Sequence, residues 1–156
     1  MDPFAVGLAY GGAALALMGG LIGSSLALGR AGMTGSASLA EDPKQFRNVF
    51  LLASLPMTQT FYGLIVLVQF LSYINANAAS IDLSKGMALL VLGIVVGAAE
   101  FFSALYQGQV CASGIIELPR TRGGITFSAM VLAVYVELVG ILGMVSGLIG
   151  LSLIGS

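Results

Sequence analysis

Histidine and tryptophan are absent from this 156-residue chain, and cysteine occurs once, as Cys111. Without histidine, the chain has no Ser-His or Cys-His pair with which to activate a nucleophile. The lack of any His or Cys cluster also argues against zinc or another transition metal, and a single cysteine excludes an internal disulfide. We therefore expect no catalytic residues and no transition-metal centre in this chain.

Charged residues are also scarce, at 8% of the chain, and the formal net charge is -1. A chain without an excess of basic residues has no electrostatic surface for nucleic acid, so we expect no nucleic-acid partner. Hydrophobic residues, by contrast, make up 58% of the chain, and the mean hydropathy is +1.02. This composition is typical of a membrane protein in contact with lipid.

Four apolar runs cover residues 4–29, 49–74, 86–107 and 125–154. Each run exceeds the roughly 20 residues that a helix needs to cross a bilayer. The expected fold class is therefore an all-α membrane protein with four transmembrane helices, each joined to the next by a short polar connection.

The basic residues predict how these helices are oriented. Lys85 alone lies beside the second connection, whereas the other five lie beside the first and third: Arg30, Lys44, Arg47, Arg120 and Arg122. Lys and Arg are enriched in the cytoplasmic loops of membrane proteins. We therefore expect a multi-pass protein of the cell membrane, with both hairpin loops in the cytoplasm and both termini outside.

The two halves of the chain resemble each other. Residues 29–35 align with residues 108–114, an offset of 79 residues, and the alignment continues with a one-residue gap to set Gln59 opposite Glu137. Each half then consists of a helix, a polar loop with a proline and a second helix. This self-similarity predicts two duplicated transmembrane hairpins, residues 1–80 and residues 81–156, of which the second carries Glu137.

Glu137 lies near the middle of the almost wholly apolar segment 123–154. Placing a carboxylate there costs about 2.5–3.5 kcal/mol on insertion scales, so such a residue indicates a functional site. Ion binding and transport are the functions that this placement favours.

Four residues of the second helix lie on one face with the spacing i, i+3, i+4 and i+7: Leu55, Thr58, Gln59 and Tyr62. Pro56 has no backbone N–H, and we expect it to free nearby carbonyl oxygens. Gln107 on the third helix and Glu137 on the fourth are expected at similar depths in the bilayer. These groups are therefore expected to meet.

Together they offer a hydroxyl, two amide oxygens, a backbone carbonyl and one carboxylate. A set of about five or six hard oxygens with one negative charge fits a monovalent cation, whereas Ca²⁺ or Mg²⁺ favours more carboxylates. The Tyr62 hydroxyl is placed to donate to the carboxylate of Glu137. The alternative for Thr58, Gln59 and Gln107 is a set of hydrogen bonds between helices without an ion.

Glu100 is a second acid within an apolar run, seven residues before Gln107 and so on nearly the same helix face. We expect it to be protonated, or to bond with Ser103 or with a hydroxyl of a neighbouring copy. A direct role in the path of an ion is the alternative.

Small residues mark the first helix, in the pairs Gly7/Gly11 and Gly19/Gly23, and more weakly the third, in Gly93/Gly97. Such pairs let helix backbones approach closely. Narrow first and third helices beside bulkier second and fourth helices predict an assembly with a crowded inner layer and a roomier outer one.

Three segments resemble a known family: LPMTQTFYG at residues 55–63, QGQV at residues 107–110 and ELVGILG at residues 137–143. They resemble the proteolipid, or rotor-ring, subunit of V-type rotary ATPases, and in particular its bacterial sodium-translocating branch. The resemblance implies that Na⁺ is held by the Leu55 carbonyl and by four side chains: Thr58, Gln59, Gln107 and Glu137. It also implies that Tyr62 supports the carboxylate of Glu137.

The same resemblance implies a ring of identical subunits in lipid, with the first and third helices inside and the second and fourth outside. It implies ion transport without ATP hydrolysis by this chain itself. The implied partners are a stator membrane subunit that supplies a basic residue and a central stalk at loops 41–47 and 118–124. Two alternatives stay open: the same rotor subunit transporting H⁺, and a small four-helix proton-coupled exporter.

Overall fold

The computed structural model describes residues 2–155 and is built of helices. The long helices are α1 (Pro3–Glu41), α4 (Leu83–Ile116) and α6 (Thr126–Gly155). Between α1 and α4 run η1 (Pro43–Gln45), α2 (Phe46–Ser54), η2 (Leu55–Met57), α3 (Thr58–Asn77) and η3 (Ala78–Ser80), and the short α5 (Leu118–Thr121) precedes α6.

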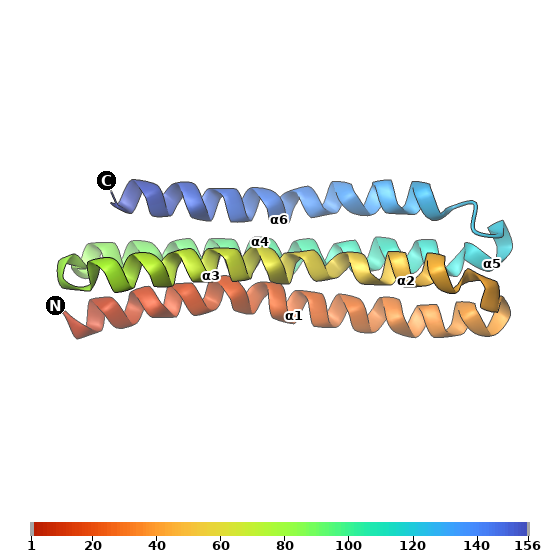
Figure 1. Cartoon of the computed structure of the whole chain (residues 1–156), viewed down its shortest axis with the longest axis horizontal. Helices are drawn as coiled ribbons and strands as arrows, with labels where there is room; N and C mark the ends of the chain where they lie inside the picture. The colour runs from red at the N-terminus through yellow and green to blue at the C-terminus, as the bar shows by residue number, and fades with distance from the viewer. Residues whose placement is uncertain (1, 156) are drawn as a thin grey trace.

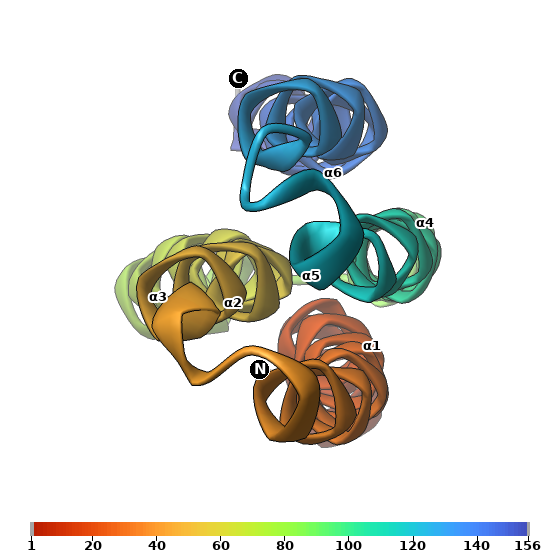
Figure 2. The same ribbon diagram turned by 90° about the vertical axis from the view of Figure 1, so that its right-hand side faces the viewer.

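Four helical stretches within residues 2–155 are long and apolar enough to cross a membrane: Pro3–Glu41, Pro43–Ser80, Leu83–Ile116 and Thr126–Gly155. They lie side by side along the long axis of the molecule, with both ends of the chain at one end and the α1–α2 and α4–α6 connections at the other (Figure 1). Viewed from the end that holds these connections, α4 lies between α1 and α6, and α2 and α3 lie beside them (Figure 2). The predicted all-α membrane fold is confirmed.

The helix α1 is longer than its apolar run. It continues through residues 29–35, and the first connection is reduced to the few residues around η1. Ala31, Gly35 and Ser38 are buried in this extension, and a Cβ at position 35 would lie 2.6 Å from Val49 Cγ1. Packing against α2 thus keeps a polar, glycine-rich stretch helical, which hydropathy alone does not detect.

Asp42 closes this connection. Its carboxylate accepts hydrogen bonds from the Gln45 side-chain amide at 2.9 Å and from the Lys44 N–H at 3.1 Å. These bonds, that of Gln45 foremost, lower the pKa of Asp42. Because the folded-state pKa is depressed, this contribution to loop stability is present at neutral pH and is lost as the pH falls through that lowered value.

Glycine brings α1 close to two neighbours. A Cβ at Gly19 would overlap the backbone carbonyl of Gly97 on α4, and a Cβ at Gly20 would lie 3.1 Å from the Thr60 Cα on α3. The expected close approach of the first and third apolar helices therefore exists within a single subunit, between α1 and α4.

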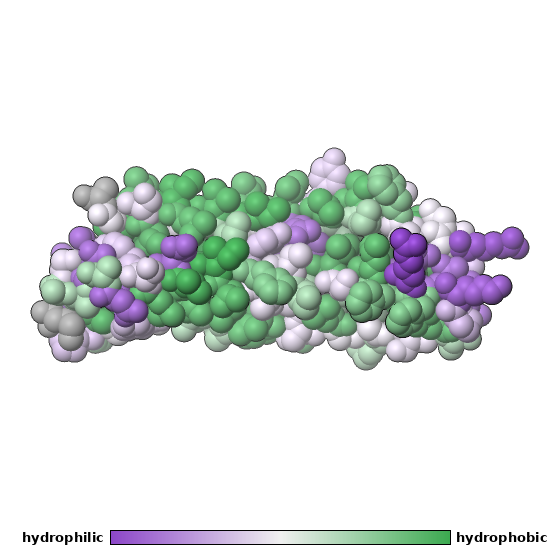
Figure 3. Space-filling model, in the orientation of Figure 1, coloured by the Kyte–Doolittle hydropathy of each residue, from purple (hydrophilic) through white to green (hydrophobic). Residues whose placement is uncertain are grey.

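Large apolar side chains remain on the outside of the molecule. Phe127, Tyr135 and Leu142, all on α6, keep 70%, 68% and 64% of their surface exposed. Hydrophobic colours cover most of the middle of the space-filling view, and hydrophilic colours gather toward its two ends (Figure 3). A surface of this kind faces lipid or further copies of the chain.

Candidate functional site

The site is built where α3, α4 and α6 meet, and it begins at the break between α2 and α3. Pro56 has no N–H to continue the α-helical ladder, and η2 forms there, with the Thr58 N–H bonded to the Leu55 carbonyl. This short 3-10 turn places Leu55, Thr58 and Gln59 at the start of α3, as their spacing predicts.

Glu137 presents its carboxylate to the neighbouring helices and is 8% exposed. The Tyr62 hydroxyl donates to Glu137 Oε1 at 2.7 Å, and Gln107 Nε2 donates to Glu137 Oε2 at 3.1 Å. Each carboxylate oxygen thus receives one donor. Donors of this kind bind a carboxylate more strongly than a neutral acid, and they fix its orientation.

Two buried amides extend this network toward α3. Gln59 Nε2 donates to Gln107 Oε1 at 2.9 Å and to Ser103 Oγ at 3.0 Å, and both glutamines have no exposed surface. Ser103 Oγ in turn donates to the Val136 carbonyl at 3.0 Å. The amides are therefore held in place by partners from α4 and α6.

Thr58 completes the group on the other side. Its Oγ1 lies 3.2 Å from the Leu55 carbonyl oxygen and 3.2 Å from Gln59 Oε1. A hydroxyl carries one hydrogen, so it cannot donate to both of these acceptors at full strength. Two acceptor oxygens, the Leu55 carbonyl and Gln59 Oε1, therefore share the one hydroxyl hydrogen of Thr58. Such an electron-rich set is suited to a cation.

All six residues that the sequence analysis selects lie in this one connected group. The Tyr62 hydroxyl donates to the carboxylate, as expected. The expectation for Pro56 is wrong in one respect: the Leu55 carbonyl is not freed, since it accepts from both the N–H and the hydroxyl of Thr58. A cation at this oxygen would replace the hydroxyl hydrogen.

Ser103 also belongs to this hydrogen-bond network, although it is not among the site residues predicted from the sequence. Its signal is present in the sequence, because it precedes Gln107 by four residues and so shares its helix face. Of the alternatives given for Glu100, the bond with Ser103 is absent within residues 2–155, where neither Glu100 oxygen has a hydrogen-bond partner. The single proton of Ser103 goes to Val136 instead.

Comparison with known proteins agrees with this architecture. Residues 4–70 match the family model for the C subunit of ATP synthase. The chain is 32% identical over 114 residues to the V-type sodium ATPase subunit K of Enterococcus hirae, an alignment that covers 70% of this chain and 71% of that protein. It is 28% identical over 144 residues to the A-type ATP synthase subunit K of Methanocaldococcus jannaschii, covering 92% of this chain and 60% of that protein.

The relatives confirm the family that the three sequence segments indicate. They also set aside the exporter alternative, since the matched proteins are rotary ATPase subunits. The chain therefore belongs to the proteolipid family of V- and A-type rotary ATPases, multi-pass membrane subunits that form a ring of identical copies and translocate ions without hydrolysing ATP themselves.

Proposed function

We propose that this protein carries Na⁺ across the membrane as its ring turns. In this proposal Glu137, Gln107, Gln59 and Thr58 bind the ion through their side chains, and Leu55 through its carbonyl. The observation that carries the proposal is the convergence of Thr58 Oγ1, the Leu55 carbonyl and Gln59 Oε1, where two acceptor oxygens share the one hydroxyl hydrogen of Thr58. A site built for a proton needs only one acceptor beside a glutamic acid, whereas Na⁺ replaces its hydration shell with several oxygens.

The transport step follows from charge. Glu137 with bound Na⁺ is neutral, and it passes into lipid without the cost of a bare carboxylate. A basic side chain close to Glu137 favours the empty, charged carboxylate and displaces the ion. This chain has no Lys or Arg in α3 or α6, the two helices that hold Tyr62 and Glu137. The basic group is therefore assigned to a separate stator subunit.

The number of ions follows from the repeat. In the alignment of the two halves, Gln59 occupies the position that Glu137 has in the second half. The Gln59 side-chain amide donates to Gln107 and Ser103. Each subunit then carries one transported ion for four membrane helices. Fewer ions for each turn of the ring favour ATP-driven pumping against a steep gradient. The duplication of 1–80 and 81–156 behind this count stays a prediction.

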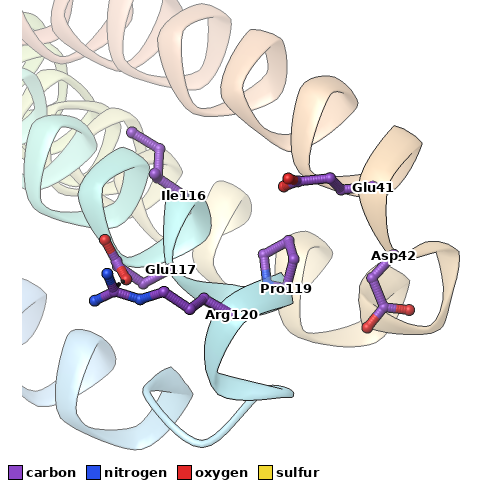
Figure 4. A pocket seen from close by; sticks show the side chains of 6 residues that line it. All are labelled: Glu41, Asp42, Ile116, Glu117, Pro119 and Arg120. Carbon is purple, nitrogen blue, oxygen red and sulfur yellow. Dashed lines mark ion pairs between the residues drawn. The ribbon is translucent and has the colours of Figure 1, made fainter.

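The central stalk is proposed to contact the end of the subunit that holds the two hairpin loops, which we place in the cytoplasm. There a hollow of about 580 Å³ lies between the end of α1 and the start of α5 (Figure 4). It is lined by side chains from both loops: Glu41, Asp42, Ile116, Glu117, Pro119 and Arg120. Arg120 is paired with Glu117 at 2.8 Å, whereas Glu41 and Asp42 form no ion pair within residues 2–155, so these two carboxylates offer negative charge to a basic stalk side chain.

The Thr58 hydroxyl provides the direct test. A carbodiimide that modifies protonated carboxyl groups in apolar surroundings is applied to purified rings, and the adduct at Glu137 is measured by mass spectrometry. Na⁺ is expected to protect Glu137, more strongly as the pH rises, because fewer protons then compete for the carboxylate. In Thr58→Val, which keeps the shape and loses the oxygen, we expect at least about tenfold more Na⁺ for the same protection, as for the loss of about 1.4 kcal/mol of binding.

Thr58→Ser is the matched control, since it keeps the hydroxyl and is expected to preserve protection by Na⁺. If Na⁺ gives no protection to the unaltered ring at any pH, the ion is H⁺ and the sodium proposal is wrong. Equal protection in Thr58→Val and Thr58→Ser would remove Thr58 from the site.

Tyr62 offers a second prediction. Tyr62→Phe removes the donor at 2.7 Å from Glu137 Oε1. A hydrogen bond to a charged group contributes about 1.5–3 kcal/mol, so Na⁺ binding is expected to weaken by about tenfold to a hundredfold. The loss is expected to shrink at higher pH, where protons no longer compete. Tyr135→Phe, on the exposed face of α6, is the control, and the same carbodiimide protection assay measures both variants. An unchanged affinity in Tyr62→Phe would contradict the assigned role of Tyr62.

A further inference from the structure

Glu100 is a second membrane carboxyl that the proposed transport step does not use. It lies in the apolar part of α4 and has no exposed surface. Neither of its oxygens has a hydrogen-bond partner within residues 2–155. Buried polar groups in proteins usually have hydrogen-bond partners. Burying an acid without partners costs far more free energy when the acid is charged than when it is neutral.

The Glu100 carboxyl is packed against α6. A Cβ at Gly140 would lie 2.8 Å from Glu100 Oε2 and 3.0 Å from Ser103 Oγ. A Cβ at Gly143 would lie 3.7 Å from Glu100 Oε1. The two glycines, about one and two turns beyond Glu137, thus leave the space that the carboxyl fills. Glu100 on α4 is therefore enclosed against α6, the helix that carries Glu137, and water and lipid are excluded from it.

The two acids of the membrane region have opposite surroundings. Glu137 receives donors from Tyr62 and Gln107, one on each oxygen, whereas Glu100 receives none among residues 2–155. Two ionisable groups of the neighbouring helices lie in the same part of the membrane region, Tyr62 on α3 and Glu137 on α6. No basic side chain of α3, α4 or α6 lies in the membrane region to offset a charge there. A carboxylate in such a place is opposed both by burial and by the charge of Glu137.

The site at Glu100 also lacks the oxygens that Na⁺ requires. Ser103 Oγ lies with Glu100 Oε2 beside Gly140, and it already donates to Val136 and accepts from Gln59. Na⁺ needs several further ligands to replace its water. A proton needs none, because it is covalently held.

We propose that Glu100 is a second cation site of each subunit, at which a proton is bound. This proton stays on the Glu100 carboxyl throughout transport. This inference rests on the proposed function, and it sets the number of exchanged ions. Na⁺ neutralises Glu137 and the resident proton neutralises Glu100, so the loaded subunit enters lipid without net charge in its membrane region. One ion, and not two, is exchanged by each subunit.

Infrared spectroscopy of the purified ring tests this proposal, because a protonated carboxyl has its own C=O stretching band. The chain has seven acidic residues, and only Glu100 and Glu137 lie within the four apolar runs. The measurement uses excess Na⁺ at neutral pH, in a detergent without ester carbonyls. Under these conditions Glu137 is held ionised by Na⁺, and the exposed acids are ionised in water. We expect the band of one buried acid to remain in the unaltered ring.

Two variants assign the band. Glu100→Gln is expected to remove it, and Na⁺ affinity is expected to change by less than about threefold, since one neutral group replaces another. An ionised Glu100 would instead lose tenfold or more in Na⁺ affinity on neutralisation, because a shift of 1.36 kcal/mol already equals a factor of ten. Glu137→Gln is expected to keep the band, because Glu100 is then the remaining acid in the apolar runs. This variant therefore assigns the band to Glu100 even if Glu100→Gln does not assemble.

A ring without a protonated-carboxyl band in excess Na⁺, or a band that vanishes in Glu137→Gln and survives in Glu100→Gln, would overturn the inference. Failure of the sodium proposal gives a different result. In that case Na⁺ leaves Glu137 protonated, and the unaltered ring shows a second buried-acid band, which Glu137→Gln removes.

Discussion

Replacing Glu137 by glutamine is expected to abolish Na⁺ binding and transport while leaving the ring assembled. Glutamine has the same shape and removes the one negative charge of the proposed site. Two unit charges about 4 Å apart attract each other by roughly 4 kcal/mol at the effective dielectric of protein sites, and 1.4 kcal/mol is a factor of ten in affinity. The loss of Na⁺ affinity is therefore expected to reach about a thousandfold, which ²²Na⁺ uptake and equilibrium binding measure directly.

Glu117→Gln is the matched control for this prediction. It makes the same chemical change at an acid outside the site, where Glu117 pairs with Arg120 at 2.8 Å. This variant is expected to bind Na⁺ as the unaltered ring does, and native mass spectrometry shows whether both variants form rings. Intact Na⁺ uptake in Glu137→Gln would remove the carboxylate from the transport mechanism and with it the whole proposed site.

The membrane helices could be predicted from the sequence because a long apolar run has few alternatives in a bilayer. Their ends could not. The apolar run stops at residue 29, yet α1 continues to Glu41, since the buried faces of Ala31 and Gly35 pack against neighbouring helices. Hydropathy averages over all faces of a helix and so overlooks a stretch with one buried face. Tertiary packing decides where such a helix ends.

The site was predictable to a similar extent. The face of Thr58, Gln59 and Tyr62 follows from helical periodicity, and it lies as expected beside Glu137. The place of Ser103 depends on the relative depth of α4 and α6, which the turn from Leu118 to Ile125 sets. The periodicity of residues within one helix does not predict the relative depth of two helices. For the same reason the sequence left a bond between Ser103 and Glu100 open as one alternative, whereas the Ser103 hydroxyl donates to the Val136 carbonyl.

The close contact of α1 and α4 leads to the second large effect, on stability. A Cβ at Gly12 would overlap the Leu89 carbonyl oxygen and lie 2.8 Å from the Leu90 Cα, so its neighbours are backbone atoms that have no rotamer to change. Gly12→Ala therefore forces the two helices apart. Overpacking of this kind costs about 1–3 kcal/mol or more. Separation of α1 from α4 is also expected to shift α4, the helix that carries Gln107.

Gly11→Ala is the matched control, one residue away on the same helix. A Cβ there would lie 3.5 Å from Leu90 Cδ1, an ordinary contact with a flexible side chain. Both substitutions gain the same helix propensity, about 1 kcal/mol over glycine, so their difference isolates the backbone contact. Thermal denaturation of purified rings is expected to occur at a lower temperature in Gly12→Ala and to be unchanged or raised in Gly11→Ala. Equal stability of the two variants would show that α1 and α4 do not pack at Gly12, because only that contact distinguishes the two positions.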